Sequence, residues 1–266
     1  MRAAKSILRI TSLGSGSRGN STLIEDENTC ILVDLGFTLK EIEKRLHRAG
    51  RKPEDISGVL VTHEHSDHIN GVGAFARKYK TAVYLTPGTL ASDRLGQVKD
   101  LHKVNCHRPF KVGSLSIEPV AVPHDAREPC QYVISSGRVA IGVLTDLGHI
   151  TPHVERHYER CDALLLECNH DLQMLADGPY PYTLRQRVGG MLGHLNNQQA
   201  AGLLQKIELP RLQQLVISHI SEKNNATHLA LDAVNQVLQG NASGWQGQLQ
   251  VAQQDTGFDW LEILPS

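Results

Sequence analysis

Four metal-binding side chains stand within six residues of one another, and no other feature constrains this chain as much. They are His63, His65, Asp67 and His68, which form the pattern HxHxDH. Imidazole and carboxylate groups are ligands that divalent transition metals take in proteins, and so dense a match seldom arises by chance. The pattern therefore predicts a metal-binding loop.

The flanking residues predict where that loop lies in a fold. The apolar run 58–61 before it is typical of a buried strand, and the segment 71–78 after it predicts a helix. Ligands on a loop at the carboxyl end of a strand are able to converge on one point. We therefore expect a strand, a metal-binding loop and a helix in succession.

The composition indicates a protein with a packed core and no membrane span. The 266 residues are 40% hydrophobic, and no apolar run reaches the roughly 18 residues that a membrane helix needs. Residues 1–10 are basic but lack the apolar stretch and cleavage site of a secretory signal. We expect a cytoplasmic protein without membrane contact.

The cysteines and the net charge limit the classes of protein to which this chain is able to belong. The five cysteines include no CxxC pair, so we expect reduced and mostly buried thiols. The net charge of −1 argues against a protein that coats nucleic acid. It is compatible with an enzyme that handles nucleic acid at one local site.

Strand and helix patterns alternate in two blocks along the chain. Strands are expected at 7–13, 20–25, 29–35, 58–61, 82–85, 115–122, 130–135, 138–144, 163–167, 212–218 and 258–263. Helices are expected at 38–50, 71–78, 198–207 and 227–238. This order predicts an α/β protein, a four-layer αββα sandwich of two sheets with helices outside, formed by residues 1–266 as a single domain.

Three further candidate ligands each end an expected strand and enter a polar turn. They are His124, Asp146 and His219. A histidine without such a context is more often an ordinary surface or core residue. For that reason no site role is assigned to His47, His102, His107, His149, His153, His157 and His228.

The HxHxDH motif, followed by His124, Asp146 and a late Ser-His at His219, resembles the metallo-β-lactamase superfold of hydrolases. The resemblance implies the αββα fold and a dinuclear site of Zn²⁺, Mn²⁺ or iron. It implies one metal on His63, His65 and His124, and the other on Asp67, His68 and His219. Asp146 would bridge both metals, and a metal-bridged hydroxide would be the nucleophile.

Two positions discriminate between members of that superfold. Asp146 stands where typical β-lactamases of the fold carry Cys, which argues against antibiotic hydrolysis. His65 stands where the diiron oxygen- and NO-reducing members carry Glu. No flavodoxin-like extension accompanies the motif either, so we expect hydrolytic rather than redox chemistry.

A second pattern points towards phosphodiesters. Glu167, a Gly-His at His194 and the late His219 occur in an order similar to that of the tRNA 3′-processing endonucleases. The resemblance implies that Glu167 orients His194 and that His194 protonates the leaving oxygen. The alternative is structural: Glu167 caps a helix, and His194 stands at the start of a helix over 196–206.

The resemblance that covers most of the chain is to the bacterial YycJ/WalJ group. It rests on the segments 13–21, 167–171 and 221–225. It implies a phosphodiesterase, with 5′-to-3′ exonuclease action on DNA as the leading activity. The chain lacks the insertion of the β-CASP nucleases and the arm of the tRNA-processing enzymes, so we expect an open site and no large folded RNA substrate.

The Gly/Ser segment 14–21 predicts an anion-binding loop. Its side-chain donors are Ser17, Arg18, Asn20 and Ser21, and its small residues let backbone N–H groups approach a phosphate. The segment is not a P-loop, because no Gly-Lys-Ser/Thr follows. The alternative is a plain turn between two strands.

Residues after the strand 163–167 are expected at the edge of the site. Asn169 and His170 are close to Glu167 in sequence and are expected to contact the substrate. Tyr180 and Tyr182 either stack on nucleobases or pack within a proline turn, and the surrounding prolines favour packing.

These observations favour a two-metal phosphodiesterase that acts on nucleic acid, with Asp67, Glu167 and His194 as its catalytic residues. A thioester hydrolase of the glyoxalase II type would use the same metal ligands but would leave Glu167 and His194 without a role. A scaffold protein with a structural metal needs only four closed ligands. The sequence leaves the metal, the choice of DNA or RNA and the oligomeric state open.

Overall fold

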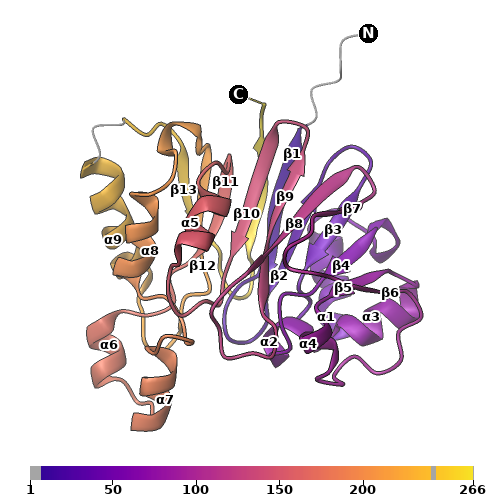
Figure 1. Ribbon diagram of the computed structural model, residues 1–266, viewed down its shortest axis with the longest axis horizontal. Helices are drawn as coiled ribbons and strands as arrows, with labels where there is room; N and C mark the ends of the chain where they lie inside the picture. The colour runs from indigo at the N-terminus through magenta and orange to yellow at the C-terminus, as the bar shows by residue number, and fades with distance from the viewer. Residues whose placement is uncertain (1–6, 241–243, 266) are drawn as a thin grey trace.

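Two mixed β-sheets lie face to face at the centre of the protein, with helices on both outer surfaces (Figure 1). The computed structural model describes residues 7–240 and 244–265, so most of the basic N-terminal segment and part of the turns after the last helix lie outside it. Within the described residues each sheet has seven strands. The predicted αββα sandwich is therefore confirmed.

The first sheet has the order β14-β1-β2-β3-β4-β5-β6. Its strands are β1 Leu8–Gly14, β2 Ser21–Glu25, β3 Cys30–Val33, β4 Gly58–Leu60, β5 Val83–Leu85, β6 Leu101–Lys103 and β14 Phe258–Ile263. The second sheet has the order β13-β12-β11-β10-β9-β8-β7. Its strands are β7 Phe110–Val112, β8 Leu115–Ala121, β9 Cys130–Ser136, β10 Val139–Leu144, β11 Ala163–Glu167, β12 Gln214–Ser218 and β13 Gln248–Val251.

Helices lie on the two outer faces and beyond the strand ends (Figure 1). They are α1 Leu39–Arg48, α2 Ser66–Ile69, α3 Val72–Tyr79, α4 Pro87–Leu90, α5 Pro152–Tyr158, α6 Leu172–Asp177, α7 Tyr182–Val188, α8 Asn197–Leu204 and α9 Thr227–Gly240. Short 3₁₀ turns occur at Pro53–Asp55 and Leu209–Arg211. Among the described residues no helix has the length and apolar character to cross a membrane.

Three apolar clusters hold the layers together. The central one lies between the sheets and includes Ile10 and Ile31 from one sheet and Ile134 from the other. A second cluster joins the first sheet to α1 and α3, and a third joins the second sheet to α5, α8 and α9. Burial of apolar surface on both faces of each sheet explains the nearly continuous apolar composition of strands such as β11.

The strand directions position the site. Strands β3 and β4 are parallel, and so are β10, β11 and β12. Strand β8 runs the same way as β10, because each is antiparallel to β9. In open sheets, ligands bind beyond the carboxyl ends of such strands. The loops that follow β4, β8, β10 and β12 carry the predicted metal ligands.

Most expected strands and helices are confirmed to within a few residues, and the differences concern short elements. The sequence did not predict β6, β7, β13, α5 or the pair α6 and α7. Inside the HxHxDH motif, Ser66–Ile69 forms one helical turn. The five cysteines are buried, as expected.

Candidate metal centre and active site

The predicted ligands meet at one end of the sandwich in overlapping groups. The ligand atoms of each group lie within 4.8 Å of one another. The groups are His63 with His65 and His124, His63 with His68 and Asp146, and Asp67 with His68 and His219. None of the seven histidines that were assigned no site role belongs to a ligand group among the described residues.

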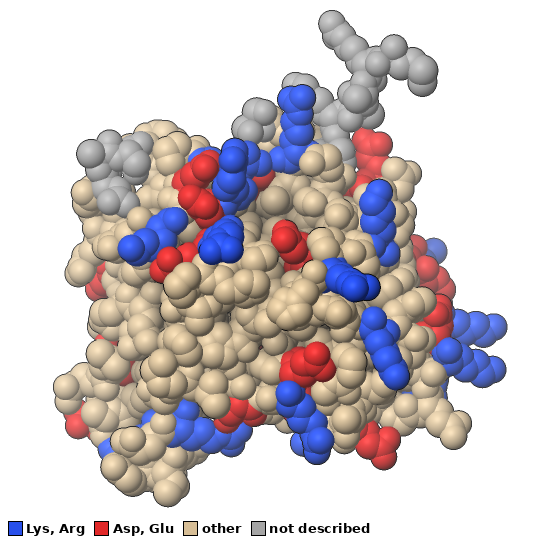
Figure 2. Space-filling view, viewed as in Figure 1, with Lys and Arg blue, Asp and Glu red and all other residues tan. Residues whose placement is uncertain are grey.

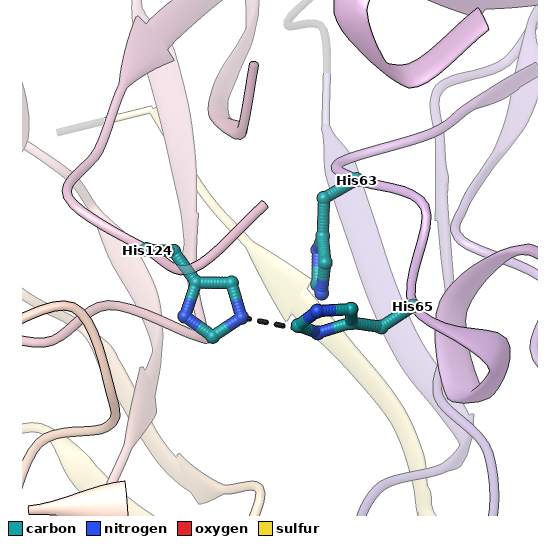
Figure 3. A group of neighbouring side chains, drawn as sticks. All are labelled: His63, His65 and His124. Atoms are coloured by element: carbon teal, nitrogen blue, oxygen red, sulfur yellow. Dashed lines mark hydrogen bonds between the residues drawn. The ribbon is translucent and has the colours of Figure 1, made fainter. Parts of the chain in front are cut away.

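Three imidazoles form one of these groups. Figure 3 shows the rings of His63, His65 and His124 turned towards one another from two different loops. Nε2 of His124 lies 3.3 Å from Nδ1 of His65, and the ring centroids of His63 and His124 are 4.8 Å apart. Nδ1 of His124 lies 3.0 Å from the carbonyl oxygen of Gly193, which it reaches as a donor. Its Nε2 is therefore left with a lone pair for a cation.

Asp34 orients two further ligands and was not predicted. Its Oδ2 accepts from Nδ1 of His68 at 2.7 Å and from the hydroxyl of Thr62 at 2.8 Å. Because the single hydroxyl proton of Thr62 goes to Asp34, its oxygen accepts from Nδ1 of His63, which is 2.9 Å away. Both histidines are thus held with Nε2 available as a ligand.

The cluster fits divalent cations. Nε2 of His63 is buried and has no hydrogen-bond partner among the described residues. Burial lowers the pKa of His63 well below its ordinary value, which keeps the ring neutral. Burial opposes the ionisation of Asp67, but nearby His68 and His219 outweigh it and lower the pKa of that carboxyl. Neutral imidazole and ionised carboxylate are the forms that bind a metal.

Asp34 and two of the predicted ligands have an unusual backbone conformation. Asp34, Asp146 and His219 have φ angles of 60°, 53° and 52°, in the left-handed region that non-glycine residues seldom adopt. Each follows the carboxyl end of a strand, so the sharp turn directs its side chain back over the sheet edge. Such strain concentrates at functional sites, where the surrounding structure over-determines it.

Buried Glu167 and partly exposed His194 form an ion pair beside the predicted ligands. Oε1 of Glu167 accepts from Nδ1 of His194 at 2.7 Å, and Oε2 accepts from the backbone N–H groups of Leu147 and Leu195. Burial would raise the pKa of Glu167, but His194 outweighs it and lowers that pKa to about 2. Burial likewise opposes the charge on His194, and Glu167 overcomes it and raises the pKa of His194.

This arrangement suits His194 to proton donation better than to metal binding. Glu167 and His194 also fall into a possible ligand group with Asp146 and His219. However, both oxygens of Glu167 are already engaged as acceptors. With Nδ1 on Glu167, Nε2 of His194 is the nitrogen left for a substrate.

A cavity of about 330 Å³ opens over the ligands. Its lining includes the ligand residues His65, Asp67, Asp146 and His219, together with His194, Ser17, Asn169, Ser221, Asp125, Gly193, Tyr180, Leu184, Arg187 and Val188. Predicted metal ligands and His194 therefore share one opening with polar side chains that are able to contact a phosphate.

The residues expected to bind substrate have different surroundings. Ser17 and Asn169 line the cavity. Asn20 is buried behind it, with Nδ2 at 3.3 Å from Oδ2 of Asp67 and 3.2 Å from Nε2 of His68. Arg18 is paired with carboxylates of two exposed residues, and Ser21 donates to a backbone carbonyl; neither lines the cavity.

His170 and Asp125 complete the surroundings of the site. His170 is buried and does not line the cavity, and neither of its ring nitrogens has a hydrogen-bond partner among the described residues. Asp125 was not predicted. Its Oδ1 lies 3.5 Å from Nε2 of His124 and 3.7 Å from Nε2 of His65. Its place next to His124 was the signal in the sequence that could have indicated it.

The fold and the ligand groups define a metallo-β-lactamase-fold protein. The family model described as a β-lactamase superfamily domain matches residues 29–220. A solved structure of the metallo-β-lactamase-fold protein YhfI from Bacillus subtilis covers 97% of this chain, with a TM-score of 0.73 and 16% identity, and is itself covered completely. The chain belongs to the β-lactamase superfamily, whose fold implies divalent metal ions.

Two relatives make the family assignment more specific. The exodeoxyribonuclease WalJ of Streptococcus pneumoniae is 36% identical over 236 residues, which are 86% of this chain and 88% of WalJ. The exodeoxyribonuclease YycJ of Bacillus anthracis is 32% identical over 243 residues, which are 89% of this chain and 91% of YycJ. The chain therefore belongs to the WalJ/YycJ family of metal-dependent hydrolases.

Proposed function

We propose that the protein is a two-metal phosphodiesterase that removes nucleotides from the 5′ end of DNA. Both relatives carry the name exodeoxyribonuclease and match this chain over most of its length. The donor set of imidazoles and carboxylates suits Zn²⁺ or Mn²⁺, with iron as a third candidate. The ligands would divide as His63, His65 and His124 for one ion and Asp67, His68 and His219 for the other, with Asp146 between them.

One observation carries the phosphodiesterase assignment: the Glu167–His194 pair beside the cavity. Two bound divalent cations supply activated water and neutralise charge on the oxygens of a displacement at phosphorus. The departing alkoxide still needs a proton, and general acids of this kind contribute roughly 10² to 10⁴ in rate. Nε2 of His194 would give up that proton, and Glu167 would hold the ring in the required orientation.

Polar groups of the cavity would hold the phosphate during the reaction. Ser17 and Asn169 both line the opening over the ligands. Asn169 also donates to the carbonyl oxygen of His219 at 3.1 Å, so it is fixed relative to a metal ligand. A thioester hydrolase on the same ligands would require neither Glu167 nor His194, and the relatives do not favour it.

The test is digestion of DNA labelled at either end by metal-loaded wild type and by His194→Ala. We expect wild type to release nucleotides from the 5′ end, and His194→Ala to lose roughly 10² to 10⁴ in kcat while keeping its metal. His149→Ala is the matched control, since His149 lies outside both the ligand groups and the cavity lining.

Different outcomes would overturn different parts of the proposal. An unchanged rate in His194→Ala would contradict the phosphodiesterase mechanism and would favour the thioester alternative. Release that starts from the 3′ end or from internal positions would contradict the 5′ polarity and leave phosphodiester cleavage standing. No cleavage of DNA by the metal-loaded wild type would remove the nuclease assignment altogether.

A further inference from the structure

Helix α7 forms one wall of the catalytic cavity and has little packing of its own. None of its seven residues is buried. In Figure 1, α6 and α7 project from the lower left of the sandwich, beyond the ends of the strands. A short helix gains most of its stability from a packed face, but the aliphatic residues of α7, Leu184 and Val188, are only half-buried.

The two faces of α7 have different surroundings. Leu184, Arg187 and Val188 are spaced as neighbours on one helical face, and all three line the catalytic cavity. Tyr182 and Arg185 line a separate surface hollow on the other side. Only the first face therefore adjoins the metal ligands and His194.

Arg187 brings a positive charge to the mouth of the cavity. It is the only Lys or Arg among the residues that line the cavity in the described part of the chain. Its guanidinium is half exposed and pairs with Asp125, whose carboxylate also faces His65 and His124. Figure 2 shows basic side chains over the lobe that α7 forms. A divalent cation at those histidines would attract Asp125 and release Arg187 for an anion.

Tyr180 supplies an aromatic ring to the same wall. It lines the cavity, and Nζ of Lys223 lies 5.8 Å from its ring centroid. The segment before Tyr180 packs closely against the loop that follows β12. The close approach is shown by Gly178, where a built Cβ would lie 2.4 Å from the side-chain oxygen of Asn224. Tyr182, by contrast, is 68% exposed and lies outside the cavity, so the predicted packing within a proline turn is wrong for it.

We propose that Tyr180 and the cavity face of α7 bind the nucleotide next to the scissile phosphate of a single DNA strand. Tyr180 stacks on its base, Leu184 and Val188 contact its apolar surface, and Arg187 pairs with the adjoining phosphate. An aromatic ring, an apolar surface and a cation in one wall match the base, sugar and phosphate of a nucleotide. A base in a duplex is stacked on both faces, so this wall favours a single strand. The inference rests on the proposed nuclease function.

The experiment measures kcat and KM on single-stranded DNA for Tyr180→Ala and Arg187→Ala. Stacking on an aromatic ring contributes enough that we expect KM to rise about tenfold for Tyr180→Ala, with a smaller change in kcat. For Arg187→Ala we expect a similar rise, and a slope of log KM against log salt that is shallower by about 0.7. Arg187→Lys should recover most of that slope.

Tyr182→Ala and Arg185→Ala are the matched controls, because they change the same residue types on the face of α7 that does not line the catalytic cavity. Both should stay within about twofold of wild type. If wild type cleaves DNA and all four variants have equal KM values, the binding wall is wrong while the nuclease function stands. If wild type does not cleave DNA, the nuclease function itself fails.

Discussion

Asp34 shows how one carboxylate outside the ligand set prepares two ligands at once. It accepts directly from His68 and, through the hydroxyl of Thr62, fixes the tautomer of His63. Residues that orient ligands in this way are worth roughly 10 to 100-fold in metal affinity. The affinity of the site thus depends on a residue that touches neither the cation nor the substrate.

We expect Asp34→Asn to weaken metal binding by roughly 10 to 100-fold, measured by competition with a chelator of known affinity. The amide is able to donate as well as accept, so the tautomers of His63 and His68 are no longer fixed. Asp93→Asn is the control, because Asp93 also has a positive φ, of 58°, but is not in a ligand group. Equal affinities in the two variants would show that Asp34 orients nothing.

Glu167 and His194 should behave as a unit. We expect Glu167→Gln and His194→Ala to lower kcat on DNA by roughly 10² to 10⁴, and the double variant to lose little more than the worse single one. The physical reason is that Glu167 acts through His194, by its 2.7 Å hydrogen bond. Losses that multiply in the double variant would mean that the two residues act independently.

At the scale of the elements, close packing of three loops sets the geometry of the candidate centre. Gly36 follows β3, and a Cβ built on it would lie 1.8 Å from the carbonyl oxygen of Asp67. That same carbonyl accepts from the backbone N–H of Asn20 at 2.8 Å. The loop after β3, the Gly/Ser loop and the metal loop therefore have a fixed separation that only glycine permits.

Gly36→Ala should lower the free energy of unfolding by about 1 to 3 kcal/mol and weaken metal binding, because the metal loop has to move. Gly202→Ala is a control with the opposite sign. Gly202 lies inside α8 with no atom close to a built Cβ, so alanine there should stabilise by about 0.5 to 1 kcal/mol. Urea unfolding of the metal-free proteins measures the free energy of unfolding of both variants. If Gly36→Ala unfolds with the same free energy as wild type, the close packing of Gly36 against Asp67 is contradicted.

The carboxylate of Glu25 pairs with Arg9 of β1 and with Arg51. These ion pairs should make the stability of the fold depend on pH. Burial would raise the pKa of the Glu25 carboxyl, but Arg51 and Arg9 donate to it and lower that pKa below its ordinary value of 4.5. A lowered pKa in the folded state gives stability that is present above pH 4.5 and is lost as the pH falls through the folded value.

Glu25→Gln should therefore cost about 1 to 3 kcal/mol at pH 7, and this difference from wild type should shrink as the pH falls below 4. Urea unfolding of the metal-free proteins at several pH values measures it, since metal loss at low pH is then excluded. A difference that is constant between pH 7 and pH 3 would contradict the role of the ionised carboxylate.

For the whole molecule, the sequence predicted the two sheets and their outer helices well. The reason is that the spacing of apolar residues indicates which face of a strand or helix is buried. The strands β1, β8 and β11 and the helices α1 and α9 agree with the expected ranges to within a few residues. Short edge strands such as β6 and β7 escaped prediction, since three residues carry too little periodicity. Helix α7 escaped because only Leu184 and Val188 form its apolar face, which is too short a pattern to indicate a helix.

Some residues of the candidate site were likewise predicted from the sequence, and others were missed. Its seven predicted ligands share a motif or end a strand in a polar turn, and the structure places them together. The orienting residues Asp34 and Asp125 belong to no motif. The expected strand 29–35 included Asp34, whereas β3 ends at Val33, so the rule that indicated His124 missed Asp34. Tyr180 and Arg187 depend on how an exposed helix packs, which no local pattern reports.

The most direct test of the two-metal nuclease is the Asp67→Ala protein. Metal content and DNA hydrolysis should be measured on the same sample, with circular dichroism as the check on folding. We predict that the metal content falls below that of wild type and that DNA hydrolysis is abolished. The fold should be retained, because Asp67 belongs to none of the three apolar clusters. Full nuclease activity in folded Asp67→Ala would contradict the assignment.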